Sequence, residues 1–304
     1  MSEESQLPEE PSEAPSPPVH DPSSPQRDVP RSRLITQFVA FPLAIVLVGV
    51  SIYLFLGILT SENRTASDYL DTIRRGGINS RWQAAYELVK VLSVDRRDGT
   101  LDPRFADEIV RVFESSTHDD PRVRRYLTRA MEMVDSPVVV AALIDALEDP
   151  DDETRLYAIA SLGGLRATAS VPDLLRFATD ADAGFRKSAI FALGQMEDAR
   201  VPETLRSALS DPVADVRWNA ALQLARRGDD SGGRILGEMI DRPFLETLKM
   251  SEEQRVTAMV YAIRSVGVLK LDGLSSAIAT LKLEDPSMKV RQAAIEAIDA
   301  WETP

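Results

Sequence analysis

Side chains that could act as nucleophiles or metal ligands are scarce in this chain of 304 residues. It has no cysteine, and its only histidines are His20 and His118. Thiolate chemistry, disulfides, zinc sites and histidine-based triads therefore lack the residues they need. Two acidic clusters, Asp119-Asp120 and 149–153, could attract Ca²⁺, although helix capping and a solvated turn explain them better. We predict no catalytic residue, no metal and no cofactor, and expect that the protein is not an enzyme.

The charge of the chain limits its partners as well. Its 48 acidic residues outnumber the 35 lysines and arginines, which gives a formal net charge of −13. Proteins that bind nucleic acid neutralise phosphates with Lys and Arg. No glycine-rich phosphate loop follows a strand pattern here. We therefore expect no nucleic-acid partner.

A regular spacing of arginines gives the first indication of the fold. Four of them are 31 residues apart, and looser copies precede and follow these four. The seven are Arg81, Arg124, Arg155, Arg186, Arg217, Arg255 and Arg291. Ala usually follows after three positions and Leu or Ile after seven, which places both on one face of a helix. A repeat this short cannot bury its own apolar face and must stack on its neighbours.

Each unit is expected to hold two helices, with the arginine on the second. Several second helices are preceded by Asp, usually as Asp-Pro, and we expect N-caps at Asp120, Asp149, Asp211 and Asp285. A first helix is indicated by residues 171–175 and again by residues 201–205, and no alternating strand pattern competes. The predicted fold is all-α, an α-solenoid of about seven helical hairpins over residues 79–304.

The unit Asp-Pro-x-x-x-Val-Arg-x-x-Ala, present in full at 211–220, resembles HEAT repeats of the type named after phycobilisome lyases. The resemblance extends over residues 79–301. In that family the repeat serves as scaffold, adaptor, regulatory subunit or, more rarely, chromophore lyase, and its Asp and Arg positions form a stacking ladder between units. The chain departs from the pattern at Asp180-Ala181, which lacks the proline, and at Asp120, which stands four residues before its arginine instead of six.

The resemblance also implies where a partner would bind. In HEAT-like solenoids the second helices line the concave face, so the positions one and five after each arginine should point into the groove. Those positions, with Tyr157 adjacent, hold Trp82, Tyr86, Leu156, Phe191, Trp218 and Leu222. An exposed aromatic and apolar stripe is typical of a protein-binding surface. Close packing of neighbouring second helices would instead bury the same side chains between units.

An uncharged apolar run from Leu34 to Ser61 is long enough to cross a bilayer, which takes about 20 apolar residues. A cleavable signal peptide is the main alternative, but its apolar region spans only about 7–15 residues, lies near the terminus and ends in a small-residue cleavage site. The run starts at Leu34 and lacks such a site. We predict one uncleaved transmembrane helix over 34–61, after a disordered Pro/Glu/Ser-rich tail (1–33) and before a juxtamembrane stalk (62–78).

The charges beside this run favour one orientation. Near the run, three arginines precede it and one follows it: Arg27, Arg31, Arg33 and Arg64. By the positive-inside rule the N-terminus would be cytoplasmic, and the solenoid would face the periplasm from the inner membrane of a bacterium. A longer window adds three arginines to the far side and weakens this prediction.

The function that fits these observations is a membrane-anchored, non-catalytic scaffold or adaptor for a protein partner, such as a membrane complex. Two alternatives stay open. One is an accessory or regulatory subunit of a membrane transport complex. The other is a bilin lyase-like enzyme, which only the family resemblance suggests.

Overall fold

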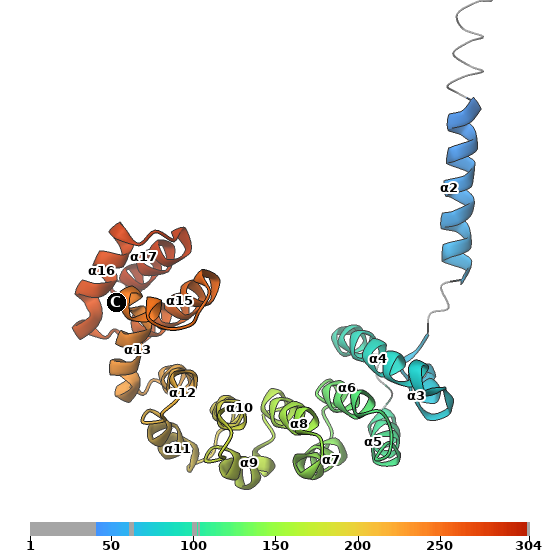
Figure 1. Ribbon diagram of the computed structural model, residues 1–304, viewed down its shortest axis with the longest axis horizontal. Coiled ribbons are helices and arrows are strands. Elements are labelled where there is room, and N and C mark those ends of the chain that lie inside the picture. Colours follow the sequence, from blue (N-terminus) through green and yellow to red (C-terminus); the bar gives the residue numbers. More distant parts are fainter. Residues whose placement is uncertain (1–40, 61–63, 99–101, 103, 303–304) are drawn as a thin grey trace, which may run out of the picture. The chain divides into compact units, whose positions relative to one another are not determined.

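The computed structural model describes residues 41–60, 64–98, 102 and 104–302. The chain separates into two compact units, Met1–Asn63 and Arg64–Pro304. Within the described residues every regular element is an α-helix or a short 3-10 helix, as the sequence predicted (Figure 1). The predicted disordered tail, 1–33, lies outside the described residues.

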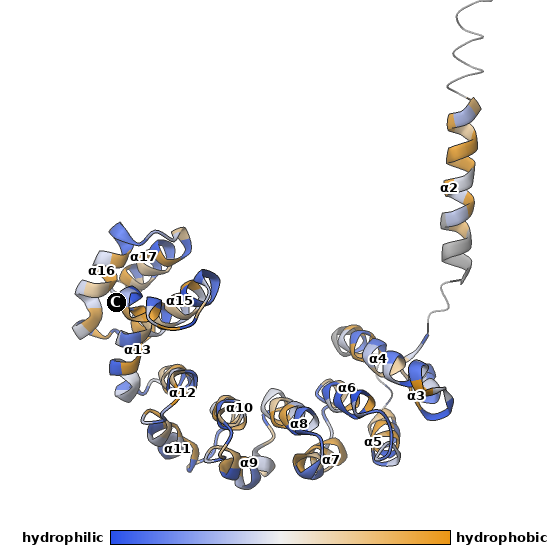
Figure 2. Cartoon of the chain, viewed as in Figure 1, coloured by the Kyte–Doolittle hydropathy of each residue, from blue (hydrophilic) through white to orange (hydrophobic). Residues whose placement is uncertain are grey.

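The described part of the first unit is a single helix, α2 (Phe41–Thr60). Its described side chains are mostly apolar (Figure 2), and large ones such as Phe41, Leu43 and Tyr53 are exposed. Among the residues that the structure describes, no helix combines the length and the apolarity needed to cross a membrane. The predicted transmembrane segment, 34–61, continues past both ends of α2 into residues outside the description.

The second unit consists of helical hairpins, and its described residues form seven pairs of helices. The pairs are α3 (Ala66–Arg75) with α4 (Ile78–Asp98), α5 (Phe105–Ser115) with α6 (Pro121–Met131), α7 (Pro137–Asp145) with α8 (Asp152–Gly164), α9 (Val171–Phe177) with α10 (Ala183–Gly194), α11 (Val201–Ala208) with α12 (Ala214–Arg226), α13 (Gly233–Ile240) with α15 (Glu252–Leu269), and α16 (Ser275–Glu284) with α17 (Met288–Glu302). A short helix, α14 (Arg242–Glu246), separates α13 from α15. Each of the seven arginines lies in a second helix, so the repeat was identified correctly.

The second helices pack on one another in chain order, from α4 through α6, α8, α10, α12 and α15 to α17. Within this unit α6, α8, α10 and α12 follow the inner side of a curved row, and α5, α7, α9 and α11 follow its outer side (Figure 1). The concave surface of these repeats is therefore built from the helices that contain the arginines.

The repeat array starts earlier than the sequence indicated. Helix α3 begins at Ala66, within the segment expected to be a juxtamembrane stalk, and packs on α4 and α5. Its Leu70 and Ile73 are fully buried in the same core as the following repeats. A capping box at Thr65 fixes the start of this helix. Residues 66–75 thus form the first helix of the first hairpin.

Small and apolar residues at fixed positions hold the second helices together. In three central repeats, the residues three and seven after the arginine are fully buried: Ala158, Ala189, Ala220, Leu162, Leu193 and Leu224. Each buried leucine stabilises the fold by about 1.5–3 kcal/mol. Gly163 in α8 lies so close to α10 that a Cβ there would be 2.8 Å from Cα of Ala192. Small side chains therefore set the spacing between neighbouring repeats.

The aspartates expected to be N-caps divide into two groups. Asp120, four residues before its arginine, caps α6 by accepting a hydrogen bond from the backbone N–H of Arg122. The other three stand six residues before their arginines and lie ahead of the helix start: Asp149, Asp211 and Asp285. Each accepts a hydrogen bond from the backbone N–H two residues on. Their prediction as caps was wrong, because the cap position is two residues later, at Asp151 in α8 for example.

Candidate functional site: the arginine ladder and the concave groove

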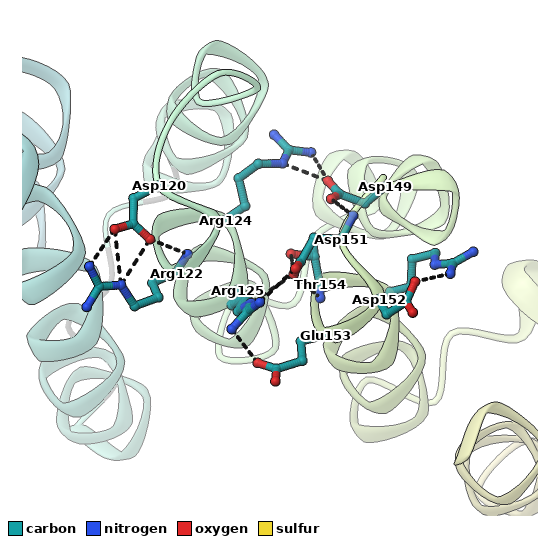
Figure 3. Close-up of polar contacts among 10 residues, drawn as sticks. Asp120, Arg122, Arg124, Arg125, Asp149, Asp151, Asp152, Glu153 and Thr154 are labelled. Carbon is teal, nitrogen blue, oxygen red and sulfur yellow. Dashed lines mark hydrogen bonds and ion pairs between the residues drawn. The ribbon is translucent and has the colours of Figure 1, made fainter. Parts of the chain in front are cut away.

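The three aspartates that do not cap form ion pairs between repeats. Arg124 of α6 donates from Nε to Oδ2 of Asp149 over 2.6 Å (Figure 3). Its Nη1 donates to the carbonyl of Phe113 over 2.8 Å. The Asp149 side chain is only 1% exposed and that of Arg124 is 13% exposed. One guanidinium thus joins the last turn of α5 to the turn that opens the next second helix.

Arg186 repeats this arrangement two junctions further along, between α10 and α12. It donates to both carboxylate oxygens of Asp211, over 2.7 and 3.0 Å, and its Nη1 donates to the carbonyls of Asp180 and Ala181. The hydrogen bond from Arg186 holds the pKa of Asp211 below its ordinary value, and the backbone N–H of Val213 acts in the same direction.

The remaining rungs of the ladder vary. Arg155 pairs with the exposed Asp152 and stacks over the ring of Phe185 at 4.7 Å, instead of reaching the next turn. Arg217 donates to the carbonyls of Asp211 and Pro212. In the last two repeats Arg255 and Arg291 also donate to carbonyls of the turn before their own helix. These arginines are occupied by structural contacts within the solenoid.

The sequence analysis missed one ion pair between repeats. Arg242, at the start of α14, donates from Nε and Nη2 to the buried Asp285 over 2.8 and 2.9 Å. The pair spans 43 residues, which is longer than the 31-residue repeat. The Arg-Pro dipeptide at 242–243 was the available signal, because it occupies the place of the usual Asp-Pro with the opposite charge.

The acidic cluster at 149–153 is accounted for by these contacts. Asp151 caps α8 through the N–H of Thr154 and pairs with both Nε and Nη2 of Arg125, over 2.8 and 2.7 Å (Figure 3). These hydrogen bonds, chiefly that from Arg125, hold the pKa of Asp151 well below its ordinary value. Glu153 pairs with the same guanidinium. The cluster therefore connects two repeats.

A groove of about 1250 Å³ lies on the concave side, between α10, α12 and α15. Three of the predicted partner-binding residues line it: Phe191, Trp218 and Leu222. Phe191 is 47% exposed, Leu222 is half-buried, and Trp218 is almost fully buried. The Nε1–H of Trp218 has no hydrogen-bond acceptor among the described residues. The two interpretations of the aromatic stripe therefore apply to different residues, since Phe191 is open to a partner and Trp218 is packed between repeats.

The other predicted residues lie elsewhere on the second helices. Leu156 is half-buried against the core, and Tyr157 is exposed beside it. Trp82 is half-buried beneath the guanidinium of Arg122. Tyr86 is exposed and makes an edge-to-face contact with Tyr126. These side chains do not line the groove.

Helix α15 contributes groove residues that the sequence analysis missed. Tyr261 is 56% exposed and Val268 is largely exposed, and both line the groove together with Met250. Tyr261 stands six positions after Arg255, whereas the positions considered were one and five. The irregular stretch before α15 obscured its register, although an aromatic residue one place from the expected position was a usable signal.

Comparison with known proteins identifies the repeat. Residues 109–185 and 171–254 match the model of HEAT repeats. No curated protein sequence matches the chain. Among solved structures, the fold is similar to YibA of Escherichia coli, with 15% identity over 78% of this chain and 82% of that one and a TM-score of 0.53. It is also similar to the CpcE–CpcF complex of phycocyanin lyase from Nostoc, with 16% identity over 80% and 96% of the two chains and a TM-score of 0.51.

Proposed function

We propose that this chain, whose residues 109–254 are HEAT repeats, is a non-catalytic scaffold that is anchored in a membrane and holds another protein in its concave groove. The observation that supports a binding role most directly is the groove between α10, α12 and α15. Phe191 and Tyr261 are exposed in it, and polar residues also line it. HEAT repeats generally mediate interactions between proteins.

The groove has the composition of a protein-binding surface. Aromatic side chains are frequent anchors at protein interfaces, because each buries a large area and loses little conformational freedom. Here two exposed rings lie among carboxamides and charged groups that could form a polar rim, including Gln195 and Asn219. The arginines that recur through the solenoid are engaged in structural contacts, so the proposal assigns them no chemistry.

The sequence supports the membrane anchor. The run 34–61 contains no charged residue, and its length exceeds the roughly 20 apolar residues that a bilayer requires. On the described part of this run the apolar side chains of α2 are exposed, as lipid-facing side chains would be. Arginines before the run favour a cytoplasmic N-terminus and a periplasmic solenoid. Anchoring would raise the effective concentration near a membrane-bound partner, so modest affinity would suffice.

The similarity to phycocyanin lyase supports the fold alone and does not support a lyase activity. At 16% identity it does not transfer an activity, and this chain offers no cysteine and only two histidines. A role as a subunit of a membrane transport complex is a special case of the scaffold, in which the bound protein is a permease.

A comparison of three full-length variants tests the binding role. The wild-type chain, the double variant Phe191→Ala/Tyr261→Ala, and the control Leu283→Ala are each purified from membranes of their own cells after crosslinking, and captured proteins are quantified by mass spectrometry. Leu283 is 76% exposed and lies outside the groove. One partner should be captured by wild type and control and lost from the double variant. Equal capture by all three chains would refute the groove as the binding site.

The anchor is tested separately by fractionation. The full chain should stay with the membrane pellet after an alkaline carbonate wash, and protease added to spheroplasts should remove the solenoid. Release of the chain into the supernatant would contradict the anchor. A solenoid protected from protease in intact spheroplasts would reverse the proposed orientation.

A further inference from the structure

The groove differs in charge from the chain as a whole. A second, smaller hollow between α15 and α17 shares Thr257, Tyr261 and Arg264 with the groove, so the concave surface is continuous from α10 to α17. Five cationic side chains line this surface: Lys187, Arg226, Lys249, Arg264 and Lys289. Two anionic side chains, Asp215 and Glu253, line it as well. The protein has a formal charge of −13, so its groove is a locally cationic region of an acidic molecule.

Some of these charges are already paired. Lys187 lies 3.6 Å from Asp215, and Arg264 lies 3.4 Å from Glu296 on α17. Arg226 donates to the carboxamide of Gln223, which leaves its positive charge without a carboxylate in the described residues.

Lys249 and Lys289 are exposed, and among the described residues neither has a hydrogen bond or an ion pair. One groove carboxylate, Glu253, has no cationic partner among the described residues either. The unpaired charges of the surface therefore sum to a positive value.

Apolar side chains lie between these cations. Phe191 and Tyr261 are about half exposed, and Val268 and Met288 are 73% exposed. An occupant must therefore cover apolar area as well as supply negative charge. Burying the rings would recover hydrophobic free energy that the free protein leaves unused.

We propose that the occupant of this surface is an acidic segment of a partner protein, one in which carboxylates alternate with large apolar side chains. This inference rests on the proposed function and adds the chemistry of the partner. Carboxylates of the segment would pair with Lys249, Lys289 and Arg226, while its apolar side chains would cover Phe191 and Tyr261. A basic segment would meet unpaired cations, which disfavours it.

The distribution of the charges favours a peptide over other polyanions. Nucleic acid and anionic bilayers are bound by clustered Lys and Arg that match a dense array of phosphates. Here the cations stand singly among apolar side chains, with Asp215 and Glu253 interspersed. The net charge of −13 would also repel an extended polyanion at long range.

Selection from a random peptide library tests the inference without a known partner. The full chain, held in detergent micelles, is used to select from a phage library of random twelve-residue peptides, and enriched peptides are synthesised for fluorescence anisotropy. Selected peptides should carry net negative charge and at least two large apolar residues. Each of Lys249→Gln and Lys289→Gln should weaken their binding about three- to fivefold, as expected for partly exposed ion pairs. The control Lys282→Gln, on α16 outside the groove, should leave binding unchanged.

The alternative outcomes separate the two proposals. Enriched peptides that are basic or uncharged, yet lose about 30-fold in affinity in Phe191→Ala, would overturn the acidic occupant and keep the groove as a protein-binding site. Peptides whose binding is indifferent to both the lysine and the aromatic substitutions, or no enrichment at all, would overturn both proposals. Binding of the full chain to vesicles containing 30% phosphatidylglycerol that is lost in Lys249→Gln and Lys289→Gln, with no acidic peptide enriched, would assign the surface to lipid and refute the inference.

Discussion

Replacing Arg124 by alanine should destabilise the solenoid by about 3–5 kcal/mol, the cost of leaving a buried charge without its partner. The substitution removes the hydrogen bonds that Arg124 donates to Asp149, to the carbonyl of Phe113 and to Oγ of Ser116. The carboxylate left behind is 1% exposed, so water cannot replace the guanidinium without opening the junction between α6 and α8.

The same substitution one repeat later provides a matched control. Arg155 pairs with Asp152, whose side chain is 71% exposed, and such a pair is worth at most about 1 kcal/mol. Its stacking on Phe185 adds about 0.5–1 kcal/mol. Arg155→Ala should therefore cost only about 1–2 kcal/mol by these figures. Both arginines occupy the same position of the repeat, so the difference reports the buried ion pair together with the hydrogen bonds that Arg124 donates to Phe113 and Ser116.

Urea unfolding of the full chain in detergent, followed by far-UV circular dichroism, measures both costs. Repeat arrays can lose two-state behaviour, so hydrogen exchange of α6 and α8 should be followed in parallel. Protection in these two helices should fall in Arg124→Ala and stay close to wild type in Arg155→Ala. If Arg124→Ala costs no more than Arg155→Ala, the ladder does not stabilise the junctions in the way described.

Three further predictions concern packing, pH and the groove. Gly163→Ala should cost about 1–3 kcal/mol, because its Cβ would overlap the backbone of Ala192, while Gly273→Ala, which meets nothing within 4 Å, should be neutral in the same melts. The pKa of Asp211 is lower in the folded protein than its unfolded value of about 3.9. Its contribution to the free energy of unfolding is therefore fully present above the unfolded pKa and is lost as pH falls through the lower folded pKa. Urea midpoints should therefore be level from pH 7 to 5 and fall below pH 4, and Asp211→Asn should flatten that fall. Phe191→Ala should change unfolding free energy by less than about 0.5 kcal/mol, since the ring is half exposed, and a larger loss would show that it belongs to the core.

The sequence predicted those parts of the solenoid that depend on local periodicity. Ala220 and Leu224 are buried because one helical face must contact the neighbouring repeats, and a period of 31 residues makes that face visible. Phe191 and Leu222 were placed in the groove because the resemblance to HEAT repeats implies that the second helices line the concave face. Helix starts were less well predicted, since Asp149 resembles a cap in sequence and differs from one only in standing two residues too early.

Features that depend on the irregular segment were missed. Trp218 belongs to one buried cluster with residues of α13 and α15, including Met239 and Met259. The register of those helices relative to α12 is hidden by the longer stretch between them. The pair Arg242–Asp285 spans 43 residues and so falls outside the repeat period. Groove-lining residues on α15 were missed for the same reason.

Photo-crosslinking from the groove tests the central claim most directly. A benzoylphenylalanine placed at Phe191 of the full chain, irradiated in membranes of the cells that make it, should yield a discrete adduct with one partner protein. The same group placed at Leu283, which is exposed outside the groove, should yield none. Equal adducts from both positions, or an adduct from Leu283 alone, would contradict the account of the concave surface as the binding site.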